Sequence, residues 1–164
     1  MPSQNFARID LDLIEPKFLA AVLEVVAKCN ARGSYYYATL GYRTFAAQDA
    51  LYAKGRTMPG PKVTAAKGGE SAHCYGMAID FTFDTDSAKP GLQPGWKTEQ
   101  YKVLREEAEL AGLHSGAGYN DWPHVSLPGV VNKADMQPLR ESWEKSTGDT
   151  LTRLKQVWQS VTHG

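Results

Sequence analysis

The chain contains 164 residues, enough for one domain with a buried core. Hydrophobic residues make up 42% of it, and 18 Lys and Arg balance 18 Asp and Glu. This composition excludes a disordered chain, and the lack of a basic excess argues against nucleic acid as a partner. Residues 1–18 lack a cationic start followed by an apolar run, so we expect no signal peptide, no membrane insertion and synthesis in the cytoplasm. Two cysteines, Cys29 and Cys74, are too few for a disulfide framework, and we expect free thiols.

The first half of the chain predicts a helix, a strand, a second helix and a long loop. Residues 15–32 carry apolar side chains at helical spacing, with Pro in the first turn and Gly after the last, which places Cys29 in the core. The aromatic run at residues 35–40 predicts a strand, and a second helix is expected over residues 44–55. Residues 55–69 are rich in Gly and Pro, which predicts a surface loop. The cations of this region, which contains no acid, are Lys54, Arg56, Lys62 and Lys67.

The second half of the chain predicts two strands with a helix between them. In residues 77–83, aromatic and aliphatic side chains alternate with Asp80 and Thr82, which predicts a strand with one solvated face. Residues 98–111 predict a helix, and residues 124–127 predict a short strand.

Residues 130–164 predict a helical C-terminal extension. Its apolar side chains recur at helical spacing and are too apolar to be left in water. We expect residues 1–129 to form the main domain and the extension to pack on it, with a wall-binding appendage as the alternative. The apolar residues concerned are Trp143, Leu151, Leu154, Trp158 and Val161.

The stretch SAHCYGMAIDF, residues 71–81, places a His, a Cys and an Asp close together in sequence. In one continuous strand, His73 and Asp80 would point to opposite faces and lie up to about 23 Å apart at roughly 3.3 Å per residue. Gly76 lies between them and allows a sharp bend, which could bring the imidazole and the carboxylate together. A rival reading is a Cys–His hydrolase that uses Cys74. Adjacent residues in an extended segment point apart, which disfavours it.

The segment DWPH, residues 121–124, offers the best distant partner because it places a second His close to a second carboxylate. A catalytic zinc ion takes three protein ligands and a water, so two imidazoles and two carboxylates would supply three ligands and one general base. The chemistry leaves open which of Asp80 and Asp121 is the ligand. Two other histidines, His114 and His163, lack such company and are expected to be structural or solvent-facing.

Three separated motifs occur in one order along the chain. They are Gly41-Tyr42-Arg43-Thr44 followed by Gln48, then Ser71-x-His73-x-x-Gly76-x-Ala78-x-Asp80, and then Asp121-x-x-His124. Together they resemble the zinc-dependent D-alanyl-D-alanine carboxypeptidase and dipeptidase family of cell-wall peptidases. Within that family, the run GYRTFAAQDALYAKGRT is most similar to the L-alanyl-D-glutamate endopeptidases found as phage endolysins. The resemblance covers residues 9–127, although many members carry a Trp-Gly-Gly segment where this chain has SGAGYN.

The resemblance implies a fold and a role for each motif residue. The implied fold is α+β, D-alanyl-D-alanine carboxypeptidase/hedgehog-like, with helices packed on a small antiparallel sheet that carries the zinc site. Asp121 falls where the family has its general base, and Arg43 matches the arginine that neutralises the oxyanion at the scissile carbonyl. The implied zinc ligands are His73, Asp80 and His124. Positions that shape the substrate pocket are matched by Ser71 and Gln48.

The resemblance therefore predicts a monomeric zinc metallopeptidase that cuts peptidoglycan stem peptides. An L-alanyl-D-glutamate endopeptidase is expected first and a D,D-carboxypeptidase second. A phage-type endolysin that reaches the wall through a holin-type pore would fit the absence of a signal peptide. The alternative from another class is a non-catalytic, zinc-stabilised module that binds the cell wall or a protein partner. The cations of residues 54–67 are expected to be solvated, with attraction of stem-peptide carboxylates as the alternative.

Overall fold

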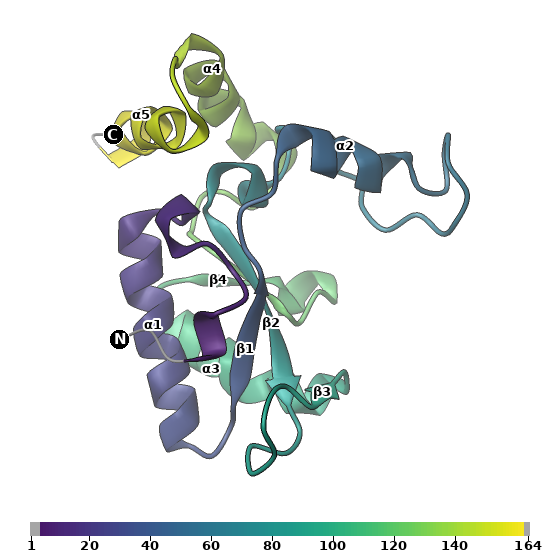
Figure 1. Ribbon diagram of the computed structural model, residues 1–164, viewed down its shortest axis with the longest axis vertical. Helices are drawn as coiled ribbons and strands as arrows, with labels where there is room; N and C mark the ends of the chain where they lie inside the picture. Colours follow the sequence, from purple (N-terminus) through teal and green to yellow (C-terminus); the bar gives the residue numbers. More distant parts are fainter. Residues whose placement is uncertain (1–3, 163–164) are drawn as a thin grey trace.

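The computed structural model describes residues 4–162 and shows a small antiparallel sheet with helices packed against it (Figure 1). The strands lie in the order β1-β2-β5-β4, and β3 also pairs with β2. Each pairing between these five strands is antiparallel. The α+β fold expected from the resemblance is confirmed. The strand bounds are Tyr36–Leu40 for β1, Ala78–Asp84 for β2, Pro94–Gly95 for β3, His114–Ser115 for β4 and His124–Ser126 for β5.

Helices α1 and α3 pack against each other and cover one face of the sheet (Figure 1). The α-helices are α1 Pro16–Ala31, α2 Phe45–Ala53, α3 Lys102–Leu110, α4 Gln137–Lys145 and α5 Thr150–Thr162. The 3-10 helices are η1 Gln4–Phe6, η2 Leu11–Leu13, η3 Ala72–Tyr75, η4 Thr98–Tyr101, η5 Gly116–Tyr119 and η6 Lys133–Met136. Between the two helices and the sheet lies the main core, which includes Phe18, Val22, Ile79, Phe81, Leu104 and Val125.

Helix α1 forms where its apolar periodicity predicts it. The carboxylate of Glu15 caps its first turn by accepting a 2.7 Å hydrogen bond from the backbone N of Phe18, and Pro16 occupies the first position, where no N–H is needed. Cys29 is fully buried on the inner face, as expected, and burial raises the pKa of its thiol to about 12. The thiol is therefore an uncharged part of the core.

Strand β2 alternates as predicted, but its second face is only partly solvated. Ile79 and Phe81 are fully buried against α1 and α3. The expectation that Thr82 faces solvent is wrong, because the hydroxyl of Thr39 on β1 lies 3.0 Å from the hydroxyl of Thr82 and the residue is 3% exposed. Asp80 on the same face keeps a partly exposed side chain.

Two predicted helices differ from the structure at their ends. The helix expected over residues 98–111 begins as the 3-10 helix η4 and continues as α3, a frequent way for an α-helix to start. Helix α2 ends at Ala53, and the loop after it projects with the helix away from the sheet (Figure 1). The Arg56 guanidinium lies 3.8 Å from the centre of the Tyr52 ring and donates hydrogen bonds to the carbonyls of Tyr52 (2.6 Å) and Thr64 (3.1 Å), which holds this loop in shape.

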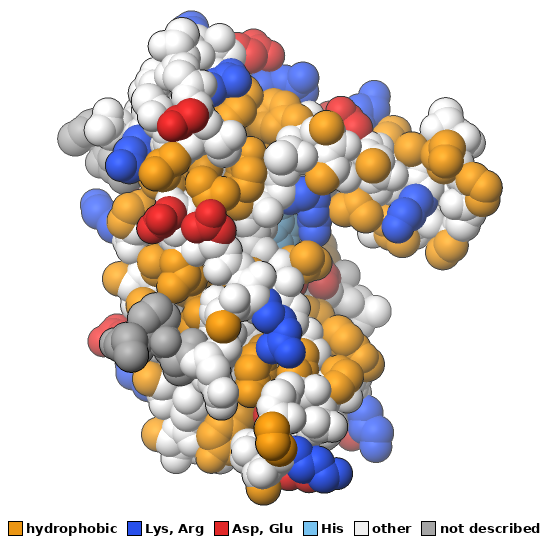
Figure 2. Space-filling model, in the orientation of Figure 1, with side chains coloured by type: hydrophobic (Ala, Val, Ile, Leu, Met, Phe, Trp, Pro, Cys, Tyr) orange, Lys and Arg blue, Asp and Glu red, His pale blue; other side chains and the backbone are white. Residues whose placement is uncertain are grey.

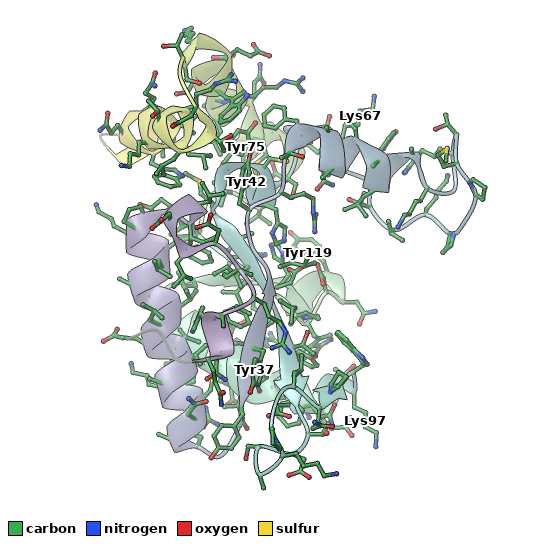
Figure 3. The ribbon with its side chains drawn as sticks, viewed as in Figure 1. Tyr37, Tyr42, Lys67, Tyr75, Lys97 and Tyr119 are labelled. Atoms are coloured by element: carbon green, nitrogen blue, oxygen red, sulfur yellow. The ribbon has the colours of Figure 1, made fainter. Side chains whose placement is uncertain are left out.

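The C-terminal segment forms two helices, α4 and α5, that contact each other and close a second core (Figure 3). Tyr75, labelled in Figure 3, accepts a 2.7 Å hydrogen bond at its carbonyl from the indole N of Trp158. Trp143 stacks on Phe45 of α2 with ring centres 5.4 Å apart. The division of the chain after Gly129 stays a prediction. Within residues 4–162, no helix combines the length and the apolar character needed to cross a bilayer.

Candidate metal centre

A short turn just before β2 aims His73 at the sheet. The hydroxyl of Ser71 caps η3 by accepting a 3.3 Å hydrogen bond from the backbone N of His73. Gly76 ends the turn with φ of 67°, in the left-handed region that favours glycine. A Cβ there would lie 2.1 Å from the carbonyl oxygen of Leu13. The bend expected at Gly76 is confirmed, and it returns the chain into β2.

Three side chains converge at the end of this bend. Strands β2 and β5 pair so that Asp80 lies opposite His124. Asp80 Oδ1 lies 3.2 Å from His73 Nε2 and 3.1 Å from His124 Nδ1. One ligand atom from each of the three residues lies within 4.8 Å of the other two, so these residues could hold a metal ion. Figure 2 shows a histidine surface in the hollow between the body and the projecting α2.

The donors in this cluster fit zinc. His73 Nδ1 lies 2.8 Å from the carbonyl oxygen of Gly41. A carbonyl only accepts, so Nδ1 carries a proton, and Nε2, which faces Asp80, is the nitrogen left to bind a metal ion. Two imidazole nitrogens and one carboxylate oxygen are a ligand set that catalytic zinc sites use.

The two carboxylates near the cluster differ in charge preference. Burial raises the pKa of Asp80, but the hydrogen bonds from His124 and His73, together with their charge, outweigh it and hold that pKa well below its usual range. Partial desolvation raises the pKa of Asp121, and the negative charge of Asp80 raises it further. Asp121 lies outside the cluster of possible ligands formed by the described residues. The site thus contains one carboxylate that stays ionised and one that is a better proton acceptor.

Asp121 is placed by a tight turn between η5 and β5. Its backbone N donates to the carbonyl of Gly116 (2.9 Å), and its own carbonyl accepts from the backbone N of His124 (3.1 Å). A Cβ at Gly116 would lie 2.4 Å from the Asp121 carbonyl oxygen, so only glycine fits there. The segment SGAGYN is therefore needed to present Asp121 beside the cluster.

A cavity of about 440 Å³ opens onto Asp121 and His124. Its other walls include residues 64–66, Glu70 and residues 131–133 of the C-terminal segment. His114 on β4 also lines it. The expectation that this histidine is structural or solvent-facing stays a prediction. Burial and the nearby His124 lower the pKa of His114. Sequence spacing gave no signal for it, because pairing of β4 with β5 brings it there; His163 lies outside the described residues.

Arg43 lies next to the turn that carries His73. Its backbone N donates to the carbonyl of His73 (2.9 Å), and its guanidinium Nη1 donates to Gln48 Oε1 (2.8 Å). Gln48 is 1% exposed and donates from Nε2 to the carbonyl of Ala66 (2.9 Å). Gln48 thus connects Arg43 to the cavity wall at residues 64–66. Ser71, in contrast, contributes by capping η3.

Cys74 does not face the cavity. It is fully buried in the second core, and burial raises the pKa of its thiol. The reason expected from the sequence was wrong, because residues 72–75 form a 3-10 helix and not an extended segment. A buried, protonated thiol is nonetheless a poor nucleophile.

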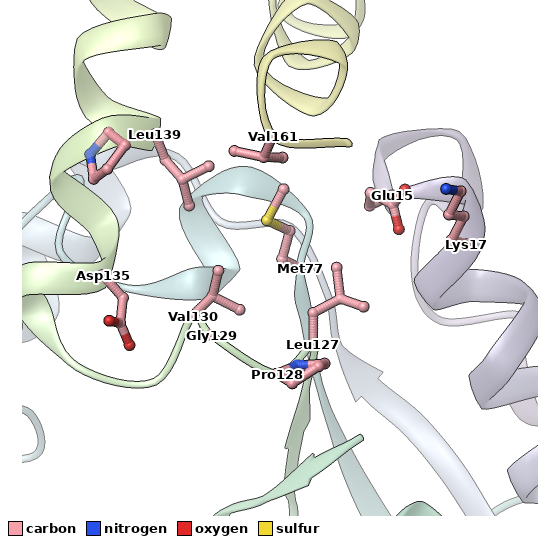
Figure 4. Close-up of a pocket in the computed structure, with 11 residues that line it drawn as sticks. Glu15, Lys17, Met77, Leu127, Pro128, Gly129, Val130, Asp135, Leu139 and Val161 are labelled. Carbon is pink, nitrogen blue, oxygen red and sulfur yellow. The ribbon is translucent and has the colours of Figure 1, made fainter. Parts of the chain in front are cut away.

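A second cavity, of about 410 Å³, lies between the C-terminal helices and the start of α1 (Figure 4). Met77, Leu127, Leu139 and Val161 make it largely apolar. The carboxylate at its edge, Glu15, already caps α1. None of the residues of the His73 cluster lines it, whereas His124 lines the first cavity, which is therefore the candidate site.

The fold and the cluster together define the class of protein. It is an α+β protein with a candidate metal site beside a small antiparallel sheet. Residues 12–121, more than half of the chain, match the family described as VanY, D-alanyl-D-alanine carboxypeptidase, and the chain belongs to this family. The family resemblance seen in the motifs is thereby confirmed.

Individual relatives match shorter stretches. The chain is 39% identical over 99 residues to the peptidoglycan L-alanyl-D-glutamate endopeptidase CwlK of Bacillus subtilis, covering 54% of this chain and 58% of that protein. It is 25% identical over 150 residues to diphthine–ammonia ligase of Bos taurus, covering 83% of this chain and 50% of that protein. The chain thus spans about half the length of these relatives. The L-Ala D-Glu endopeptidase ChiX of Serratia marcescens is a structural neighbour with a TM-score of 0.47 and 18% identity, covering 70% of this chain and 80% of that one.

Proposed function

We propose that this chain is a zinc metallopeptidase that hydrolyses the L-alanyl-D-glutamate bond of peptidoglycan stem peptides. The observation that carries the proposal is the His73, Asp80 and His124 cluster, whose member His124 lines a cavity together with Asp121, a carboxylate outside the cluster. A purely structural zinc site would close its fourth position with a ligand and would need no such base. The 39% identity to CwlK supports the choice of bond.

Each residue of the candidate site has its own role in the proposed hydrolysis. Zinc held by His73, Asp80 and His124 would polarise the scissile carbonyl and lower the pKa of the attacking water. Asp121, whose pKa is raised, takes a proton from that water and returns it to the leaving nitrogen. The Arg43 guanidinium donates to the carbonyl oxygen as negative charge develops there. Gln48 orients this guanidinium through its 2.8 Å hydrogen bond.

Digestion of purified peptidoglycan tests the proposal. The zinc-loaded protein should release fragments with a new N-terminal D-glutamyl group, identified by mass spectrometry. Chelation should abolish the cleavage and added zinc should restore it, whereas thiol alkylation should do little because Cys74 is buried. Cleavage that survives chelation but is lost on alkylation would contradict the metal mechanism.

A D,D-carboxypeptidase is the second candidate, favoured by the description of the matching family. It would release free D-alanine and leave the L-alanyl-D-glutamate bond intact, so the same digest separates the two. A non-catalytic wall-binding module would give no new termini at all.

The biological setting we propose is lysis by a monomeric, phage-type endolysin that reaches the wall through a holin-type pore. Its support is the motif resemblance to endolysins. Expression in bacteria with and without a pore-forming protein tests it, since lysis should require the pore. Light scattering on a sizing column measures the oligomeric state.

A further inference from the structure

The C-terminal segment builds one wall of the catalytic cavity. Residues 131–133 line it together with Asp121 and His124. These three residues lie outside residues 12–121, which match the family. What this wall recognises is therefore a property of this chain and does not follow from the family match.

This wall is rigidly held. Asp135 Oδ2 accepts hydrogen bonds from the backbone N of Val131 (2.9 Å) and of Asn132 (3.1 Å). Asn132 Oδ1 accepts one in return from the backbone N of Asp135 (3.0 Å), completing a capping box at η6. Met136, the last residue of η6, is 2% exposed in the same core cluster as Tyr75 of the metal-binding turn. The wall and the metal-binding turn are thus anchored in one core.

Lys133 is the one cation among the described residues that line the cavity. Its Nζ lies 3.5 Å from Glu70 Oε2, and the two side chains are 55% and 26% exposed. The same Glu70 oxygen already accepts a 2.7 Å hydrogen bond from the backbone N of Lys67, which lowers the pKa of Glu70. A long, exposed ion pair of this kind contributes little. An ammonium has three donors, so Lys133 can bind a second carboxylate without leaving Glu70.

We infer that Lys133 binds the free carboxylate of the D-glutamyl residue at the scissile bond. This inference rests on the proposed function. A glutamyl residue joined to the rest of a peptide through one carboxyl group keeps its other carboxylate free, a few bonds from the scissile nitrogen. Lys133 shares the cavity with Asp121, which protonates that nitrogen in the proposed mechanism. The wall formed by residues 131–133 therefore makes the enzyme selective for an acidic residue on the leaving side.

Two peptides that differ only in this group test the inference. One carries the free D-glutamyl carboxylate, and the other carries a carboxamide of the same shape. The ratio of their kcat/KM values should favour the acid for the full chain with zinc. Lys133→Met should lower this ratio about 10- to 100-fold, the range expected for a hydrogen bond to a charged group. Lys133→Arg should restore most of the preference, and Lys62→Met, in the exposed loop, should leave the ratio as it is. An equal loss on both peptides would overturn the inference.

Binding provides a readout that does not depend on turnover. The Asp121→Asn protein, with the substrate left intact, should bind the acid peptide more tightly than the amide in calorimetry, and adding Lys133→Met should remove the difference. Equal binding of both peptides by Asp121→Asn would refute the role of Lys133. If the unmodified protein binds the acid peptide selectively yet cuts neither, the proposed function fails and the inferred contact stands.

Discussion

Asp80 and Asp121 show how position decides the role of a carboxylate. Both lie near the same two imidazoles, yet the pKa of Asp80 is lowered and that of Asp121 is raised. Asp80 receives hydrogen bonds from both histidines, whereas Asp121 is partly desolvated and feels the charge of Asp80. Opposite shifts of this kind separate a permanently charged ligand from a proton acceptor.

Substitution of Asp121 should separate turnover from metal binding. We expect Asp121→Asn to keep its fold and its zinc but to lose about two to four orders of magnitude in rate, because an amide cannot accept the proton of the attacking water. Zinc content by atomic absorption and peptide hydrolysis measure the two effects. Asp80→Asn is the matched comparison and should lose the metal. Loss of zinc from Asp121→Asn would show that the two carboxylates have exchanged roles.

Substitution of Arg43 should also separate turnover from metal binding. Arg43→Ala should retain the metal and lower kcat by roughly two to three orders of magnitude, as expected when an oxyanion donor is removed. Arg8→Ala, which changes an exposed arginine stacked over Tyr37 at 5.0 Å, is the control and should leave kcat unaltered. A normal rate for Arg43→Ala would reduce Arg43 to a structural partner of Gln48.

At this scale, motif spacing predicted more than residue chemistry alone. His73, Asp80 and His124 could be grouped because their motifs resemble those of a known family. The residue chemistry alone left open which of Asp80 and Asp121 is the ligand. Neither His114 nor Lys133 carried a signal of its own. Each reaches the cavity through contacts between distant segments, which spacing along the chain does not encode.

Among the elements, the η3 turn controls the geometry of the metal centre. It must place His73 beside Asp80 within seven residues, and only a reversal makes this possible. The sequence identified the reversal through Gly76 but not its form, since four residues of 3-10 helix are too short for a periodic pattern. The two-residue strands β3 and β4 escaped prediction for the same reason.

Gly76→Ala should therefore weaken both stability and zinc affinity. Alanine at this position would have to adopt a positive φ, and its Cβ would lie 2.1 Å from the carbonyl oxygen of Leu13. Gly33→Ala is a matched control, because Gly33 has φ of +78° and nothing within 4 Å of a Cβ. The control should lose roughly 1–2 kcal/mol in the free energy of unfolding from φ alone, and Gly76→Ala should lose more. Urea denaturation and zinc titration measure these effects, and equal losses for the two variants would argue against a packing role.

At the scale of the whole molecule, two cores meet near the turn that carries His73. The main core lies between α1, α3 and the sheet, and the second lies between η3 and the C-terminal helices. Leu127, just after β5, packs against both. The apolar spacing of residues 130–164 predicted that this segment would be helical and packed, but it could not identify the packing partner, which is the segment that carries His73.

Removal of residues 130–164 tests how much the site depends on this second core. The truncation would uncover Tyr75, Met77 and their neighbours and would remove the 2.7 Å hydrogen bond from Trp158 to Tyr75. Each large apolar side chain taken from the core removes roughly 1.5–3 kcal/mol of burial energy, and the exposed patch favours association. We expect a lower melting temperature, self-association on a sizing column and weaker zinc binding, because the turn that carries His73 loses its support. Trp158→Phe, which removes the indole donor and part of the buried ring system, should cause a smaller loss of stability in the same direction. A truncated protein that melts at the same temperature, yet no longer sediments with cell walls, would instead identify residues 130–164 as a wall-binding appendage.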